Sequence, residues 1–124
     1  MSASERTYTL DEANAALPEL RERLARIRGS RQIVLRAAER VKAAVEADGG
    51  GHAGTDLWKA SATLKADVEW LASENILLRD PETGLIDFPS EREGREIFLC
   101  WRLGEDEVGH WHDVDAGFLG RRPL

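Results

Sequence analysis

The amino-acid sequence predicts an α+β fold, in which a long antiparallel helical hairpin packs against a small antiparallel β-meander of about four strands. Three observations predict this fold class. Apolar residues recur at helical spacing across residues 9–75, a glycine-rich connection at 48–54 divides that stretch, and residues 76–116 hold short strand-like runs between turn residues. Residues 117–124 form an irregular tail. A chain of 124 residues has the usual length of one domain, so we expect a single domain over residues 1–124.

The first helix begins at a capping box, Thr9 to Glu12, whose hydroxyl and carboxylate satisfy free amide groups of the first turn. Pro18 lacks an amide hydrogen and clashes with the preceding turn, so we expect either a kink or a short helix at 10–16 followed by a longer one. An apolar seam advances in steps of three and four residues, and Arg31 occupies the one seam position that is not apolar. Its apolar members are Leu10, Ala13, Leu17, Leu20, Leu24, Ile27, Val34, Ala38, Val41 and Val45.

The second helix spans about residues 56–75 and carries an apolar stripe formed by Leu57, Leu64, Val68 and Leu71. It is roughly 30 Å long, whereas the first helix, of about 39 residues, is roughly 58 Å long. The part of the first helix that extends beyond the second needs a partner, which is either the C-terminal part of the chain or a second copy. We therefore expect a homo-oligomer that associates through the first helix.

The meander is predicted from β-type runs that alternate with turn sequences. The first turn, at 80–84, has an early proline and a final glycine, and the last is the acidic loop at 104–107. The runs are Ile76–Arg79, Leu85–Phe88, Glu96–Leu103 and Val108–Val114.

Charge is distributed unevenly along this chain, whose net charge is −6. Residues 21–42 carry a local charge of +6, whereas residues 49–124 carry −7. Between Tyr8 and Trp58 there is no aromatic residue for base stacking, so we do not expect a nucleic-acid partner. We interpret the basic stretch as a solvated helix face, or as one that docks on the acidic half of its own or a neighbouring chain. No apolar run reaches the roughly 18 residues of a membrane span, and no secretory signal is readable. We expect a cytoplasmic protein without a membrane partner.

The last predicted hairpin contains two histidines, His110 and His112. A four-residue loop at 104–107 and a two-residue turn at 105–106 both give paired positions that sum to 211, which places Leu99 opposite His112. Both histidines then lie on one face of the sheet, among the apolar residues Ile97, Leu99, Trp101, Leu103, Val108 and Val114. Imidazole rings in such surroundings need partners for their nitrogen atoms, and residues two apart on a strand can reach the same point.

Carboxylates near the two histidines indicate a metal site. Residues 80–115 carry 11 acidic and 3 basic side chains, and such an excess needs protons, arginines or a cation for neutralisation. A mixed imidazole and carboxylate set suits iron, manganese, zinc or nickel. The competing interpretation is that each histidine bonds a backbone carbonyl or an aspartate inside the core, without a metal. The nearby carboxylates are Asp87, Glu105, Glu107, Asp113 and Asp115.

Cys100 is the single cysteine, which excludes an internal disulfide and any CxxC motif. In the predicted register it lies opposite Trp111 and away from both histidines, and only a shift of one residue would bring it beside His112. We therefore interpret Cys100 as a small apolar strand residue rather than a nucleophile. Arg121 and Arg122 are candidates for binding an anionic ligand, but we favour a solvated or salt-bridged tail.

Three stretches of the sequence also carry a family resemblance: Tyr8–Pro18, Gly84–Pro89 and Leu99–Arg121, the last with its Cys-Trp and Trp-His pairs. They resemble the bacterial domain-of-unknown-function family numbered 2203 over nearly the whole chain. That family name carries no activity, so the resemblance implies the architecture more than the chemistry. It draws attention to a metal or small-ligand site at the matching polar positions Asp87, Glu105, His112, Asp115 and Arg121. His110 departs from the family pattern, where an aromatic residue is commoner, which favours His112 as the ligand.

The sequence thus predicts a protein that binds a divalent transition metal, with a small-molecule ligand as a further option. Its predicted ligands are His112, Asp115 and Glu105, with His110 and Asp87 as further candidates. The alternative is a helical scaffold or adaptor that self-associates or binds a protein partner and holds no metal.

Overall fold

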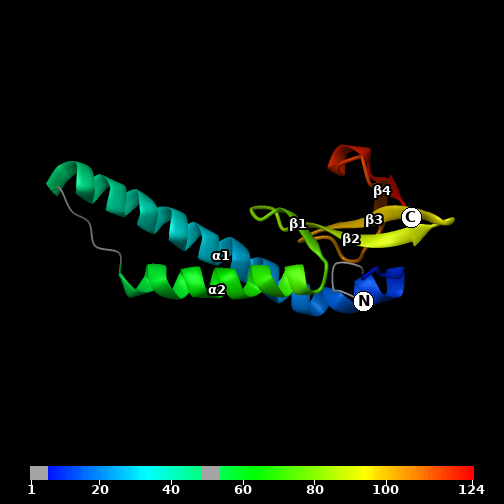
Figure 1. The fold of residues 1–124 in the computed structure, drawn as a ribbon, viewed down its shortest axis with the longest axis horizontal. Coiled ribbons are helices and arrows are strands. Elements are labelled where there is room, and N and C mark those ends of the chain that lie inside the picture. The colour runs from blue at the N-terminus through cyan, green and yellow to red at the C-terminus, as the bar shows by residue number, and fades with distance from the viewer. Residues whose placement is uncertain (1–5, 49–53) are drawn as a thin grey trace.

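The computed structural model describes residues 6–48 and 54–124, which form two helices followed by a five-stranded antiparallel sheet (Figure 1). The predicted α+β class is confirmed, with one strand more than expected. Most of the glycine-rich connection predicted at 48–54 lies outside the described residues. The elements are α1 (Leu10–Asp48), α2 (Thr55–Ser73), β1 (Leu77–Asp80), β2 (Leu85–Arg92), β3 (Arg95–Arg102), β4 (His110–Asp113), the 3₁₀ helix η2 (Phe118–Gly120) and β5 (Arg122–Pro123). Each strand pairs with its neighbours in the chain, in the order β1-β2-β3-β4-β5.

The start of α1 follows the predicted capping box. The amide of Thr9 donates to Glu12 Oε1 at 2.8 Å, and the amide of Glu12 donates to Thr9 Oγ1 at 3.1 Å. α1 then continues through Pro18 as one helix, so the alternative of a break after residue 16 is wrong. Figure 1 shows that the N-terminal part of α1, drawn in blue, runs in a different direction from the rest of the helix.

The apolar seam of α1 is buried within the chain from Ala13 to Ile27, whereas Leu10 at its start is 40% exposed. Its first half lies beneath the sheet and its second half runs beside α2 (Figure 1), so the C-terminal part covers the predicted overhang. After Ile27 the predicted seam is less buried. Val34 and Val41 are half-buried and Ala38 is exposed, whereas Ser30 and Ala37 are buried. The side chain of Val45 lies outside the described part. The buried seam residues of the first half are Ala13, Leu17, Leu20, Leu24 and Ile27.

Self-association through α1 stays a prediction. The apolar residues that α1 leaves most exposed in its second half are Ile33 and Leu35, at 41% and 48%. These positions, rather than the buried seam, are where such an interface would form.

The first part of the basic stretch of α1, from Arg21 to Arg31, is paired within the chain. Buried Asp67 of α2 accepts hydrogen bonds from Arg23 at 2.9 Å and from Arg26 at 3.0 and 3.1 Å, which ties the two helices together. Arg21 donates to the backbone carbonyl of Asp106 at 2.6 Å, and Arg28 donates to that of Glu82 at 2.8 Å. Both carbonyls lie in loops that connect strands of the sheet. The interpretation of this stretch as an internally paired face is therefore supported by direct contacts.

The register of β3 and β4 differs from the predicted one by one residue. Their paired positions sum to 210, so Phe98 lies opposite His112 and Cys100 lies opposite His110. Because side chains alternate between the two faces of a strand, this shift moves both histidines away from Leu99 and Trp101 to the opposite face. The prediction that the histidines share the apolar face was wrong, and so was the separation of Cys100 from them.

Long-range contacts set this register. The chain between β3 and β4 spans residues 103–109, where Leu103 donates to the carbonyl of Gly84 at 3.0 Å and the amide of Val108 donates to Asn14 of α1 at 2.8 Å. Val108 is thereby held in the core against α1, and the connection takes an odd number of residues instead of four. The core on the helix-facing side of the sheet includes Ile86, Phe88, Ile97, Leu99, Trp101 and Trp111.

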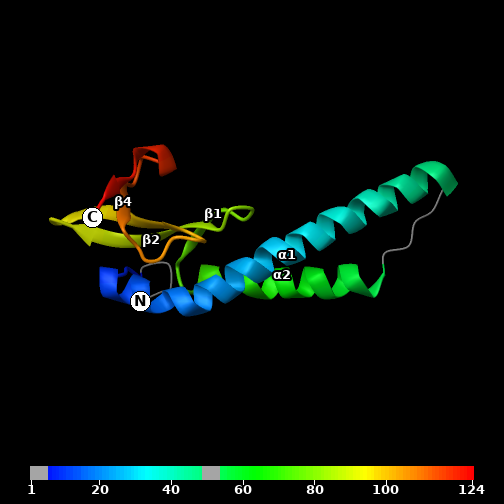
Figure 2. The same ribbon diagram turned by 180° about the vertical axis from the view of Figure 1, so that it is seen from behind.

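The predicted irregular tail is partly ordered. After β4 the chain forms η2 and then β5, which pairs with β4 through His110↔Pro123 and Trp111↔Arg122. Figures 1 and 2 show this tail on the side of the sheet opposite α1, so it stands over the outer face. Within the described residues, neither helix combines the length and the apolarity that crossing a membrane requires.

Candidate functional site

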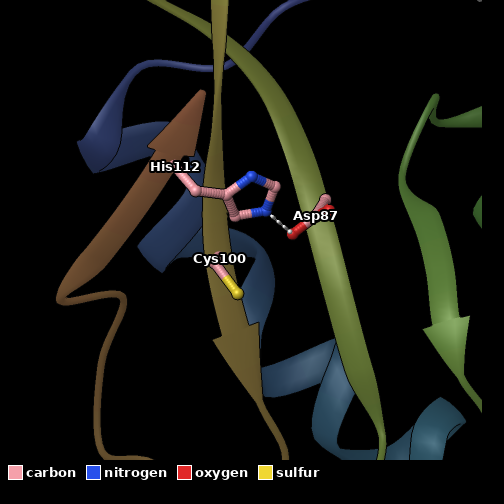
Figure 3. Close-up of side chains that lie close together, drawn as sticks. All are labelled: Asp87, Cys100 and His112. Carbon is pink, nitrogen blue, oxygen red and sulfur yellow. Dashed lines mark hydrogen bonds and ion pairs between the residues drawn. The ribbon is translucent and has the colours of Figure 1, made fainter. Parts of the chain in front are cut away.

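Three side chains meet on the outer face of the sheet, one from each of its central strands. Asp87 of β2 pairs with Cys100 of β3, and His112 of β4 lies two residues along from Cys100's partner. One ligand-type atom from each lies within 4.8 Å of those from the other two, and all three residues are buried (Figure 3). The cluster thus results from strand pairing across 25 residues of sequence.

The imidazole of His112 is fixed at both nitrogen atoms. Nδ1 lies 2.8 Å from the backbone carbonyl of Asp113, and Nε2 lies 3.0 Å from Oδ1 of Asp87 (Figure 3). Both neighbours are oxygen acceptors, so the contact to the carbonyl requires a hydrogen on Nδ1. In the neutral ring this leaves a lone pair on Nε2 that faces the Asp87 carboxylate and Cys100.

Arg79 orients the other oxygen of Asp87. Its Nε donates to Oδ2 at 2.8 Å, so the carboxylate, whose side chain is 4% exposed, is held between a guanidinium and an imidazole. A buried carboxylate needs such partners, because its desolvation in isolation is very unfavourable. Oδ1 is consequently directed toward His112 and Cys100.

The Cys100 thiol is protonated at neutral pH. Burial raises its pKa to about 11, and the negative charge of Asp87 adds to the increase, while Arg121 opposes it. A thiolate at this position therefore requires a nearby positive charge to form near neutrality. Cys100 in the metal-free protein is a poor nucleophile.

The raised pKa predicts how the thiol reacts with iodoacetamide. Because only the thiolate reacts, the alkylation rate of native protein should rise about tenfold per pH unit between pH 8 and 10. Protein unfolded in urea should instead react fast, and its alkylation rate should level off above about pH 9, because the thiol then has its ordinary pKa. Mass spectrometry of timed samples measures both rates. Native protein that reacts rapidly and independently of pH near neutrality would contradict this description of the thiol.

A second polar group adjoins the cluster and is held together by Arg121. Both oxygens of Glu105 accept from Arg121 at 3.0 Å, and His110 Nδ1 lies 3.8 Å from Glu105 Oε2. Burial raises the pKa of Glu105, but the bonds from Arg121 and the Arg102 amide outweigh it and leave the pKa below its usual range. The preferred interpretation of Arg121 as a salt-bridged tail residue is confirmed.

The sequence-predicted site residues are thus divided between two neighbouring groups. Asp87 and His112 come together, whereas Glu105 and His110 lie with Arg121. Asp115 is exposed and lines the adjoining pocket without belonging to the three-residue cluster. Cys100 is the member that sequence reasoning missed. The available signal was the one-residue alternative register, which places Cys100 and His112 on one face.

A pocket of about 380 Å³ opens beside the cluster. Its walls are the outer face of the sheet and the first part of the tail. The residues that line it are Arg79, Leu85, Asp87, Cys100, His112, Val114, Asp115, Ala116, Gly117 and Phe118. A volume of this size is in the range of small-ligand sites.

Comparison with known proteins finds a match at the family level. Residues 6–124 match the model of a family described as an uncharacterised conserved protein (DUF2203), which confirms the resemblance drawn from the sequence. No curated protein and no solved structure is matched by the chain.

Proposed function

The chain belongs to the DUF2203 family of uncharacterised conserved proteins, whose description names no activity, and we propose that it binds a divalent transition metal through Asp87, Cys100 and His112. The proposal keeps the metal-binding function expected from the sequence and changes the ligand set. It rests on the geometry of the three side chains rather than on a relative.

The contact between His112 and Asp87 is the observation that supports it most directly. With the hydrogen of the neutral ring on Nδ1, the lone pair of Nε2 faces Oδ1 of Asp87 at 3.0 Å. Two acceptors at this distance repel each other unless a positive particle lies between them. A metal ion bound between the two atoms would supply this positive charge.

The spacing of the ligand atoms suits tetrahedral coordination. Bonds of about 2.0 Å to nitrogen and oxygen and 2.3 Å to sulfur put ligand atoms about 3.3 to 3.6 Å apart. The three atoms lie within 4.8 Å of one another, and Nε2 and Oδ1 are already 3.0 Å apart. Small side-chain movements are therefore sufficient to bring them to bonding distance.

The surroundings have features typical of a metal's outer shell. The carbonyl of Asp113 fixes the His112 ring through Nδ1, and Arg79 holds the free oxygen of Asp87. Such contacts orient the side chains that bind the metal and raise metal affinity. A divalent ion would also stabilise the thiolate of Cys100, whose proton it would displace.

Among the metals expected from the sequence, the presence of a thiolate favours zinc. Cysteine sulfur is a soft ligand that suits zinc, whereas manganese prefers oxygen ligands. The two anionic ligands balance the charge of Zn²⁺, and His112 contributes a neutral donor. Glu105 is a weaker candidate because Arg121 occupies both its oxygens.

Protein purified without a nickel column and equilibrated with zinc should retain one equivalent after removal of free metal, measured by elemental analysis. Cobalt in place of zinc should produce a thiolate-to-cobalt charge-transfer band in the near ultraviolet, because a cysteine sulfur is a ligand. Protein that holds no metal under these conditions would contradict the proposal and favour the helical scaffold.

A further inference from the structure

The wall of the pocket beside the proposed metal site contains a partly exposed cationic side chain, that of Arg79. Arg79 is 43% exposed at its side chain and uses Nε on Asp87. Among the described residues, its two terminal NH₂ groups have no hydrogen-bond acceptor. The guanidinium carbon lies 5.1 Å from the centre of the Phe98 ring. Four N–H donors in a fixed planar arrangement thus remain for another acceptor.

The metal cluster also leaves a coordination position for an external ligand. Within the part of the chain that the structure describes, the cluster contains three ligand residues, and a tetrahedral ion takes four. All three of these residues line the pocket together with Arg79. A ligand in the pocket is therefore within reach of both the fourth position and the guanidinium.

The charge of the occupied site favours an anion. Zn²⁺ with the carboxylate of Asp87 and the thiolate of Cys100 is neutral, which leaves the charge of Arg79 uncompensated by Asp87. Arginine recognises planar carboxylates through two parallel hydrogen bonds. Asp115, an exposed residue that also lines the pocket, disfavours an anion that carries more than one charge.

The rest of the pocket wall is apolar, which restricts the chemical class of the ligand further. It is formed by Leu85, Val114, Ala116, Gly117 and Phe118. A short aliphatic group would bury apolar surface against these residues. A phosphate has no apolar surface and would make no such contact.

Building on the proposed metal site, we infer that the pocket binds a small monocarboxylate, with its carboxylate between Arg79 and the metal and its aliphatic end against the tail. The carboxylate supplies the fourth coordination bond and accepts from the terminal nitrogens of Arg79. The aliphatic end lies beside Val114 and Phe118.

Propionate tests this inference on the cobalt-loaded protein. It should shift the visible cobalt absorption in a saturable titration, whereas the neutral isostere propionamide and inorganic phosphate should bind at least about tenfold more weakly. Phosphate that binds better than propionate, or propionamide that binds as well, would overturn the assignment to a monocarboxylate.

Two variants locate the ligand. Arg79→Gln should weaken propionate binding by about tenfold or more, since charge-assisted hydrogen bonds are lost. Arg122→Gln, which removes an exposed arginine outside the pocket lining, should bind propionate like the unmodified protein. Equal propionate binding by Arg79→Gln and the unmodified protein would overturn the role of Arg79.

The charge-transfer band separates the two proposals. All propionate titrations are made at saturating cobalt, and the band reports directly that Cys100 is coordinated. A protein that shows the band but no response to propionate contradicts the carboxylate pocket alone. A protein without the band contradicts the metal site itself.

Discussion

Replacing His112 with alanine should lower zinc affinity by at least about 100-fold, or about 2.7 kcal/mol. The expected loss exceeds the 10- to 100-fold that removal of an outer-shell partner typically costs, because a direct coordination bond disappears. Asp87→Ala and Cys100→Ser should have effects of similar size, and Cys100→Ser should also abolish the thiolate-to-cobalt band. Competition of each variant against a zinc chelator of known affinity measures the change.

His110→Ala is the matched control for this series. His110 lies on the same strand and the same face of the sheet as His112, but its ring is directed to Glu105 at 3.8 Å. This variant should bind zinc as tightly as the unmodified protein. Circular dichroism and urea unfolding show whether each variant is folded. If His112→Ala, still folded, kept its zinc while His110→Ala lost it, the proposed ligand set would be wrong.

Trp101→Ala should destabilise the protein by about 3–5 kcal/mol, a large fraction of the 5–15 kcal/mol typical of a domain. Trp101 is fully buried on the helix-facing side of the sheet, and its Nε1 donates to the carbonyl of Glu105 at 3.2 Å. Truncation removes a large apolar contact surface, leaves a cavity and frees the loop that carries Glu105. Urea denaturation followed by circular dichroism measures the free energy of unfolding.

Trp101→Phe is the conservative comparison for this prediction. It retains an aromatic ring in the core, so it should cost less than the alanine variant, while still removing the hydrogen bond to the Glu105 carbonyl. Alanine and phenylalanine variants of equal stability would show that filling this core position contributes little.

Local sequence signals predicted the helices well. The Thr9–Glu12 capping box forms as expected, and the seam from Ala13 to Ile27 is buried. These features depend on residues three or four apart in one helix, so the sequence contains all the information that they need. Beyond Ile27 the seam prediction holds only in part, since Val34 and Val41 are half-buried and Ala38 is exposed.

The candidate site was predicted only in part. Asp87 and His112 were both identified as ligand candidates, and the structure brings them to 3.0 Å. A short turn within 104–107 would place Cys100 on the other face, but the connection spans residues 103–109 and shifts the pairing by one residue. Arg79 gave no signal in the sequence, since its role depends on the pairing of β1 with β2.

What the sequence determined by itself was the set of elements: two helices, their order, and the β-rich segment with its polar residues. The tertiary structure decided which of those polar residues meet. A strand repeats every two residues, so a shift of one residue reverses the direction of each side chain. Here that shift goes with the connection at 103–109, in which the amide of Val108 bonds Asn14 of α1, 94 residues away in the sequence. Cys100 therefore joins His112 and Asp87 through contacts that local sequence patterns do not encode.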